Sequence, residues 1–155
     1  MQYLIYADGS YHDKIADGSF AVYLISDDEC IDLLHSTLKN EQPLHISRRI
    51  RFAHDSKKTT NNFAEASILQ AVIIWCCSNN VFEQDIVVHI CMDSQLVLGQ
   101  FVGLSKTNSK KLKNIYCSIY NLLATKSSQL NKKLDQLLKF HWVSGKVMKA
   151  SIIGH

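Results

Sequence analysis

The chain has 155 residues, 46% of them hydrophobic, and a formal net charge of +3, which fits a single globular domain spanning residues 1–155. Charged residues make up 20% of the chain, and no apolar run reaches the ~18 residues of a membrane span. This composition excludes the disordered and membrane-spanning classes, and the small positive charge is a weak indication of a polyanionic partner.

The cysteines and the N-terminus indicate the cellular compartment. The five cysteines are scattered, without the Cys-x2-Cys spacing of a zinc site, and several of them lie in apolar runs. The first residues, Met1 to Leu4, lack the basic segment of a secretory signal. We therefore expect reduced thiols and a cytoplasmic protein.

The first half of the chain is predicted to form strands followed by one long helix. Residues 8–10 (Asp-Gly-Ser) are typical of a turn, and the only proline lies in a polar loop. The apolar helix is predicted to open within residues 60–65 and to end at residues 78–80. The predicted strands cover residues 2–7, 19–25, 30–38 and 44–54.

The second half alternates strands and helices. A buried strand is predicted over residues 85–92 and a last short strand over residues 140–143, while residues 147–155 are ambiguous. Helical spacing of apolar residues predicts helices over residues 96–101, 112–123 and 130–138. This order predicts an α/β fold with a mixed sheet of about five strands flanked by helices.

Glu65 lies on the apolar face of the long predicted helix. Ile68, Leu69, Val72 and Ile73 follow it by three, four, seven and eight residues, which places them on the same side of a helix. A carboxylate on such a face needs a partner, because an unpaired buried charge is costly. One interpretation is a capping box, in which Asn62 is the N-cap and Glu65 is the third helical residue. The other is a functional carboxylate.

Two aspartates follow predicted strands and strengthen the functional interpretation. Taken singly, Asp8 before Gly9 is typical of a turn, and Asp93 before Ser94 is typical of a helix cap. In open α/β sheets, however, sites form at the carboxyl ends of strands, so Asp8 and Asp93 converge if their strands are neighbours. Three clustered carboxylates repel one another unless they hold cations, and hard oxygen ligands suit Mg²⁺ or Mn²⁺. Two such ions can activate a water for phosphodiester hydrolysis.

Three motifs, in this order along nearly the whole chain, resemble type 1 ribonuclease H. They are Asp8-Gly9-Ser10 after a strand, Thr60-Asn61-Asn62-x-x-Glu65 at a helix start and Asp93-Ser94-Gln95 after a buried strand. The resemblance implies that two Mg²⁺ (or Mn²⁺) ions support cleavage of the RNA strand of an RNA–DNA hybrid. It implies that Asp8, Glu65 and Asp93 are catalytic metal ligands.

The resemblance also implies substrate contacts from polar residues beside these carboxylates. Asn61 and Asn62 match positions that face the minor groove of the hybrid, where the 2′-hydroxyl distinguishes RNA from DNA. Thr60 matches a position that holds a DNA-strand phosphate, and Gln95 is expected to face the RNA. Gly9 and Ser10 complete the expected contacts. Without the resemblance, helix capping and loop solvation account for the same polar residues.

The chain departs from the family where a fourth carboxylate is expected after the last strand. No acidic residue follows Asp135. The spacing of longer family members, counted from Trp142, places His155 at this position, and a neutral histidine can ligate a metal. The spacing of compact members places Ile152 there, which cannot. His155 is therefore a candidate fourth catalytic ligand; the alternatives are that the chain stops before the aspartate or that His155 is only a terminal residue.

These departures leave other functions open. A histidine ligand suits a related DNA-structure nuclease such as a resolvase, and loss of the fourth ligand suits a nucleic-acid-binding domain without catalysis. We expect a monomer. Basic residues are candidates for contact with the nucleic-acid backbone, although a lysine run is also typical of a solvated face. They are Arg48, Arg49, Arg51, Lys106, Lys110, Lys111 and Lys113.

Overall fold

A computed structural model describes residues 1–29, 34–35, 37–53, 60–103 and 107–154. Its strands form one sheet in the order β3-β2-β1-β4-β5. Strands β1, β2 and β3 pair antiparallel, whereas β4 is parallel to both β1 and β5, so the predicted mixed sheet of five strands is confirmed. The strands are β1 (Gln2–His12), β2 (Ile15–Ile25), β3 (His45–Arg51), β4 (Val88–Met92) and β5 (Leu138–Trp142).

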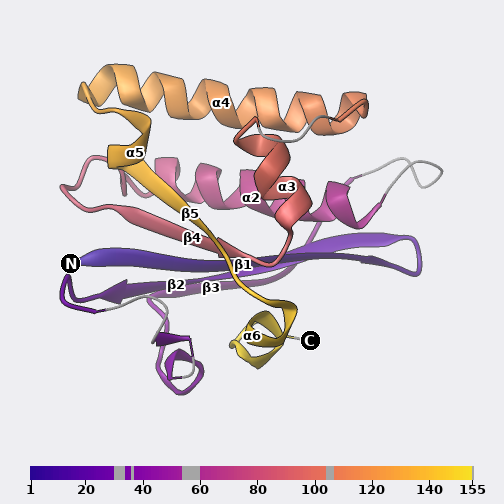
Figure 1. Ribbon diagram of the computed structural model, residues 1–155, viewed down its shortest axis with the longest axis horizontal. Helices are drawn as coiled ribbons and strands as arrows, with labels where there is room; N and C mark the ends of the chain where they lie inside the picture. The colour runs from indigo at the N-terminus through magenta and orange to yellow at the C-terminus, as the bar shows by residue number, and fades with distance from the viewer. Residues whose placement is uncertain (30–33, 36, 54–59, 104–106, 155) are drawn as a thin grey trace.

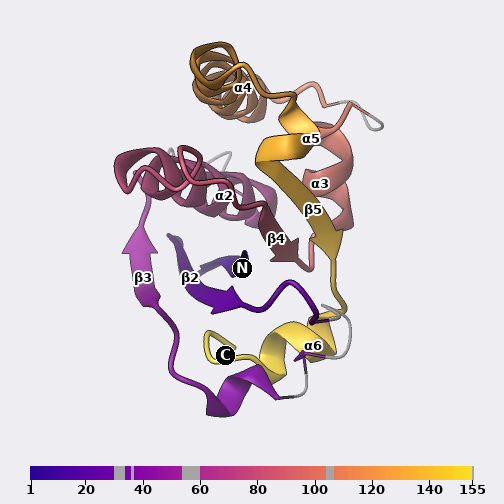
Figure 2. The same cartoon turned by 90° about the vertical axis from the view of Figure 1, so that its left-hand side faces the viewer.

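Helices cover both faces of this sheet, and the long pair lies on one of them (Figure 1). On that face the apolar stripe of α2, which includes Ile68, Leu69 and Val72, packs against Ile5 and Ile90 of the sheet. Helix α6 lies on the opposite face (Figure 2), where a smaller apolar cluster forms. The helices are α2 (Asn61–Ser78), α3 (Gln95–Phe101), α4 (Lys110–Leu130), α5 (Leu134–Leu137), α6 (Gly145–Ala150) and the 3-10 helix η1 (Leu38–Asn40).

The first hairpin corrects the predicted turn at residues 8–10. Asp8, Gly9 and Ser10 pair with Ser19, Gly18 and Asp17, so β1 continues through them. The chain reverses at Asp13 and Lys14, whose φ angles of 51° and 62° are those of a two-residue hairpin turn that follows the twist of the strands. The Asp-Gly signal was misleading because pairing with a distant strand overrides local turn preference.

One further prediction needs correction, and the structure settles part of a segment whose conformation was left open. Within residues 30–38, residues 30–33 and 36 lie outside the described part, and the described remainder leads into η1 instead of forming a strand. Of the ambiguous C-terminal segment, residues 147–150 belong to α6, which begins after the N-cap Ser144, and residues 151–154 follow the helix. In the described part of the chain, no helix is both long and apolar enough to cross a membrane.

A histidine pair joins the neighbouring strands β4 and β5. His89 of β4 is 6% exposed. Its Nδ1 lies 2.8 Å from Nε2 of His141, and its Nε2 lies 2.6 Å from Oε1 of Gln2. The amide oxygen can only accept, so this network assigns the proton of His89 to Nε2 and makes Nδ1 an acceptor. Burial, followed by the charges of His141 and Lys139, lowers the pKa of His89 to about 4.

We expect this pair to make the fold acid-labile between pH 6.5, the ordinary pKa of histidine, and about pH 4. In that window the unfolded chain binds a proton that the folded protein excludes, so stability falls as pH falls. The shift corresponds to a loss of up to about 3 kcal/mol. Urea unfolding of the wild type and His89→Gln measures it. The variant should lose less stability across the window, and parallel pH profiles would contradict the assignment.

Candidate metal centre

The sheet register brings Asp8 and Asp93 together. Strands β1 and β4 are parallel and pair Tyr6 with Cys91. Continuing this register by two residues places Asp8 level with Asp93, which directly follows β4. Asp8 therefore lies inside β1 but beside the carboxyl end of β4. It is buried, with 9% of its surface exposed.

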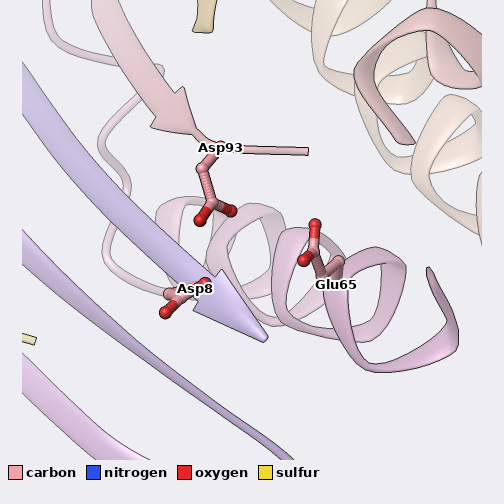
Figure 3. Close-up of side chains that lie close together, drawn as sticks. All are labelled: Asp8, Glu65 and Asp93. Atoms are coloured by element: carbon pink, nitrogen blue, oxygen red, sulfur yellow. The ribbon is translucent and has the colours of Figure 1, made fainter. Parts of the chain in front are cut away.

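Glu65 reaches the same point from α2. One carboxylate oxygen from each of Asp8, Glu65 and Asp93 lies within 4.8 Å of the others. Figure 3 shows the three side chains converging from β1, α2 and the end of β4. Among the described residues, this is the only group of at least three acidic, histidine or cysteine side chains with such spacing.

Gly9 makes the close approach of α2 to β1 possible. A Cβ atom at this position would lie 2.5 Å from the carbonyl carbon and oxygen of Ala64 and 2.6 Å from the backbone nitrogen of Glu65. Such distances are far below van der Waals contact, so any side chain at Gly9 would push α2 away from the strand. The structure therefore gives Gly9 a packing role, next to the carboxylates it was predicted to accompany.

The start of α2 differs from the predicted capping box. Thr60, with an extended backbone, is the N-cap and forms no side-chain cap hydrogen bond. Asn62 and Glu65 therefore lie inside the helix, and the cap interpretation of both is wrong. Asn61 instead ties the helix to β1, since its Oδ1 accepts a hydrogen bond of 2.9 Å from the backbone nitrogen of Tyr11.

Glu65 is in an electrostatically unfavourable position. Its Oε2 is buried and has no hydrogen-bond partner. Burial raises the pKa of Glu65 to about 7; a hydrogen bond with the Ser94 side chain opposes this rise, and the charges of Asp93 and Asp8 add to it. A buried oxygen without a partner beside two further carboxylates is a site that a cation would stabilise.

Asp93 is held by the turn between β4 and α3. Ser94 is the N-cap of α3, and its hydroxyl accepts a hydrogen bond of 3.2 Å from the backbone nitrogen of Val97. The indole nitrogen of Trp142 donates to the backbone oxygen of Asp93 over 3.1 Å. The end of β4 is thus fixed from β5 and from α3, so the carboxylate of Asp93 starts from a rigid backbone.

The donor set fits a hard divalent cation. Carboxylate oxygens are the ligands that Mg²⁺ and Mn²⁺ prefer, and the buried Oε2 of Glu65 is an acceptor without a protein partner. We expect Asp8, Glu65 and Asp93 to be the residues that hold such an ion.

The structure does not bring a fourth ligand to this group from its described residues. Ile152, the position given by the compact spacing, packs against the apolar cluster on the α6 face together with Ile153. The predicted ligand His155 lies outside the described residues. At the beginning of α6, a Cβ added to Gly145 would lie 3.9 Å from Oδ2 of Asp93, so this helix starts beside the site.

The predicted substrate-binding residues lie around the carboxylates. Thr60, Asn61 and Gln95 are exposed at the starts of α2 and α3, and Asn62 is half-buried. Ser10 is engaged within the hairpin, since its hydroxyl donates to Oδ1 of Asp17 over 2.9 Å. Their contact with a substrate stays a prediction.

Two neighbours of Glu65 were missed by sequence reasoning. Ser94 belongs to the Asp93-Ser94-Gln95 motif but was not assigned a role, and Tyr116 lies on α4. Burial and then the charge of Glu65 raise the pKa of Tyr116 to about 12, and its hydroxyl donates to Oε1 of Gln100 over 2.9 Å. The hydroxyl following Asp93 was the only signal available for Ser94; Tyr116 had none beyond its helical spacing.

No family model and no curated protein matches this chain, whereas several solved structures are similar to it. The N-terminal RNase H domain of Rv2228c from Mycobacterium tuberculosis is similar over 92% of this chain and 87% of that chain, with 22% identity and a TM-score of 0.60.

Two further structures give the same picture. RNase H1 from the halophilic archaeon Halobacterium salinarum NRC-1 is 20% identical over 93% of this chain and 86% of that chain, with a TM-score of 0.58. LC11-RNase H1, isolated from compost by a metagenomic approach and solved in complex with an RNA/DNA hybrid, is 20% identical. It covers 92% of this chain and 86% of its own, with a TM-score of 0.58. Together with the mixed sheet of five strands, these likenesses show that the chain has a type 1 ribonuclease H-like fold.

Proposed function

We propose that this protein is a divalent-metal-dependent endonuclease that hydrolyses the RNA strand of RNA–DNA hybrids. The observation that carries the proposal is the convergence of Asp8, Glu65 and Asp93 within 4.8 Å, with a buried and unpartnered oxygen on Glu65. The fold supports it, because the similar structures are RNase H domains and one of them was solved with an RNA/DNA hybrid.

In this proposal Asp8, Glu65 and Asp93 hold Mg²⁺ or Mn²⁺. Bound ions would supply a Lewis acid at the scissile phosphate and lower the pKa of an attacking water. Asp8 and Asp93 bring rigid carboxylates from adjacent strands, and Glu65 closes the site from α2. A preorganised set of ligands avoids reorganisation during the reaction, which is where much of the catalytic advantage arises.

The exposed polar side chains would position the hybrid. The carbonyl oxygen of Asn61 already accepts from Tyr11, so contact with a 2′-hydroxyl would use its amide hydrogens as donors. Asn62 and Gln95 would face the same groove, and Thr60 would hold a phosphate of the DNA strand. Contact of Gly9 and Ser10 with the substrate stays a prediction. The role of His155 as a fourth metal ligand also stays a prediction.

A cleavage assay on labelled duplexes tests the proposal. With Mg²⁺ or Mn²⁺, the RNA strand of a hybrid should be cut internally, while its DNA strand, a DNA duplex and a four-way DNA junction should stay intact; EDTA should stop the reaction. Preferred cutting of the junction would favour a resolvase-like activity. Tight hybrid binding without cleavage in Mn²⁺ would instead indicate a binding domain. Either result would contradict the proposal.

Ser94 gives a more local prediction, because its side chain both caps α3 and hydrogen-bonds with Glu65. Ser94→Ala should weaken Mn²⁺ binding by about tenfold or more, as expected when a group that orients a metal ligand is lost. Isothermal titration with Mn²⁺ measures this effect.

Ser109→Ala is the matched control for Ser94→Ala. Ser109 caps α4 in the same way, accepting from the backbone nitrogen of Leu112 over 3.3 Å. Each variant should lose about 1 kcal/mol of stability from the cap. Only Ser94→Ala should change Mn²⁺ affinity, and equal affinities in the two variants would show that Ser94 is merely a cap.

A further inference from the structure

Strand β3 lies at the edge of the sheet (Figure 2), and its sequence contains three arginines. Arg48, Arg49 and Arg51 are all exposed. In the described part of the chain, the salt bridges involve the N-terminus and lysines but none of these arginines. Three cations within four residues therefore face solvent, and no described acidic residue forms a salt bridge with them.

A β-bulge presents two of them together. Strand β2 pairs Gly18 with Ile50 and Phe20 with Ser47, so Ser19 alone stands opposite both Arg48 and Arg49. The φ of Arg49 is 52°, in the left-handed region that glycine or asparagine adopts more readily. The backbone nitrogen of Arg49 donates to the hydroxyl of the buried Ser19 over 2.9 Å, which holds the bulge in place.

The bulge lies on the same row of the sheet as Asp8. Ser19 is the direct partner of Asp8 in β1. Arg48 and Arg49 are thus two strands away from Asp8, roughly 10 Å at the usual strand spacing. A duplex carries a phosphate charge about every 1.7 Å along its axis, so a duplex over Asp8 that extends across β2 brings phosphates to the bulge.

We propose that Arg48 and Arg49 form a binding site for the phosphate backbone of a nucleic-acid duplex. The placement of the duplex rests on the proposed function, whereas the binding itself is independent of cleavage. Charges and bulges also protect edge strands from pairing with other chains. Edge protection does not require the arginines to lie level with Asp8. It also does not require an arginine at a positive φ, since glycine would form the same bulge.

Salt-dependent binding tests this site directly. Labelled hybrid and DNA duplex are titrated with the intact protein in EDTA, so that no cleavage occurs. The double variant Arg48→Ala/Arg49→Ala should bind more weakly, and the slope of log K against log salt should become shallower by about 2. The control Lys133→Ala/Lys139→Ala removes the same charge from exposed positions near α5 and should keep the wild-type slope. An unchanged slope in the arginine variant, or a wild type that binds no duplex, overturns the proposal.

Arg49→Gly separates binding from edge protection. Glycine relieves the left-handed backbone, so the melting temperature should rise while duplex affinity falls. A rise in melting temperature with unchanged affinity overturns the proposal. Cleavage is measured separately: absence of hybrid cleavage contradicts the proposed nuclease function, but arginine-dependent duplex binding would still support this site.

Discussion

Asp93→Asn is expected to reduce hybrid cleavage by at least about a thousandfold, equivalent to about 4 kcal/mol of transition-state stabilisation. Asparagine keeps the size of the side chain but removes its negative charge and replaces one carboxylate oxygen with an NH2 group, which cannot ligate a cation. The backbone of residue 93 is held by the indole of Trp142 and by the cap of α3, so the variant should remain folded. Single-turnover cleavage rates with saturating Mg²⁺ measure the loss.

Asp135→Asn is the matched control for Asp93→Asn. Asp135 is an exposed carboxylate on α5, away from the cluster, and its loss changes the net charge equally. It should cleave at the wild-type rate, and circular dichroism should show both variants folded. If Asp93→Asn cleaves within a few-fold of the wild type, the carboxylate cluster does not carry the chemistry.

Glu65→Gln should stabilise the metal-free protein above neutral pH. The pKa of Glu65 is raised from 4.5 to about 7, chiefly by burial. Between these values the folded protein holds a proton that the unfolded chain releases, so stability falls as pH rises through the window. By about pH 8 the wild type has lost up to about 3 kcal/mol from this group, and glutamine removes that loss. Melting temperatures in EDTA across this range measure the difference.

The same variant should respond poorly to metal. Mn²⁺ should raise the melting temperature of the wild type, because a ligand that binds only the folded state stabilises it. Glu65→Gln should gain much less, while being more stable in EDTA. The variant should thus melt at a higher temperature than the wild type in EDTA but gain less from Mn²⁺. A buried acid with only a structural role would not reduce the gain from Mn²⁺. A variant with the wild-type pH profile, or with an undiminished response to Mn²⁺, would contradict the role of Glu65.

Local patterns were sufficient for much of the fold. The apolar spacing after Glu65 predicted α2 because it reflects contacts with one neighbouring surface. The run ending at Met92 predicted β4, which is buried at every position. Asp8 was misplaced in a turn because its conformation is set by pairing with Ser19, a residue distant in the chain.

The three carboxylates of the site could be predicted from the sequence, but the contacts around them could not. The polar string of residues 60–65 indicated a functional helix start, yet the structure places the N-cap at Thr60 instead of Asn62. The contact of Ser94 with Glu65 and the close approach at Gly9 arise where α2, α3 and β1 meet. Such contacts depend on the packing of separate elements, which no local pattern specifies.

The most direct test of the metal centre is anomalous diffraction from crystals soaked in Mn²⁺. An anomalous peak is expected between the carboxylates of Asp8, Glu65 and Asp93, with Oε2 of Glu65 among the ligands. The peak should disappear in Asp93→Asn crystals or weaken strongly. Full Mn²⁺ occupancy elsewhere, with none between these three carboxylates, would contradict a metal centre at this site.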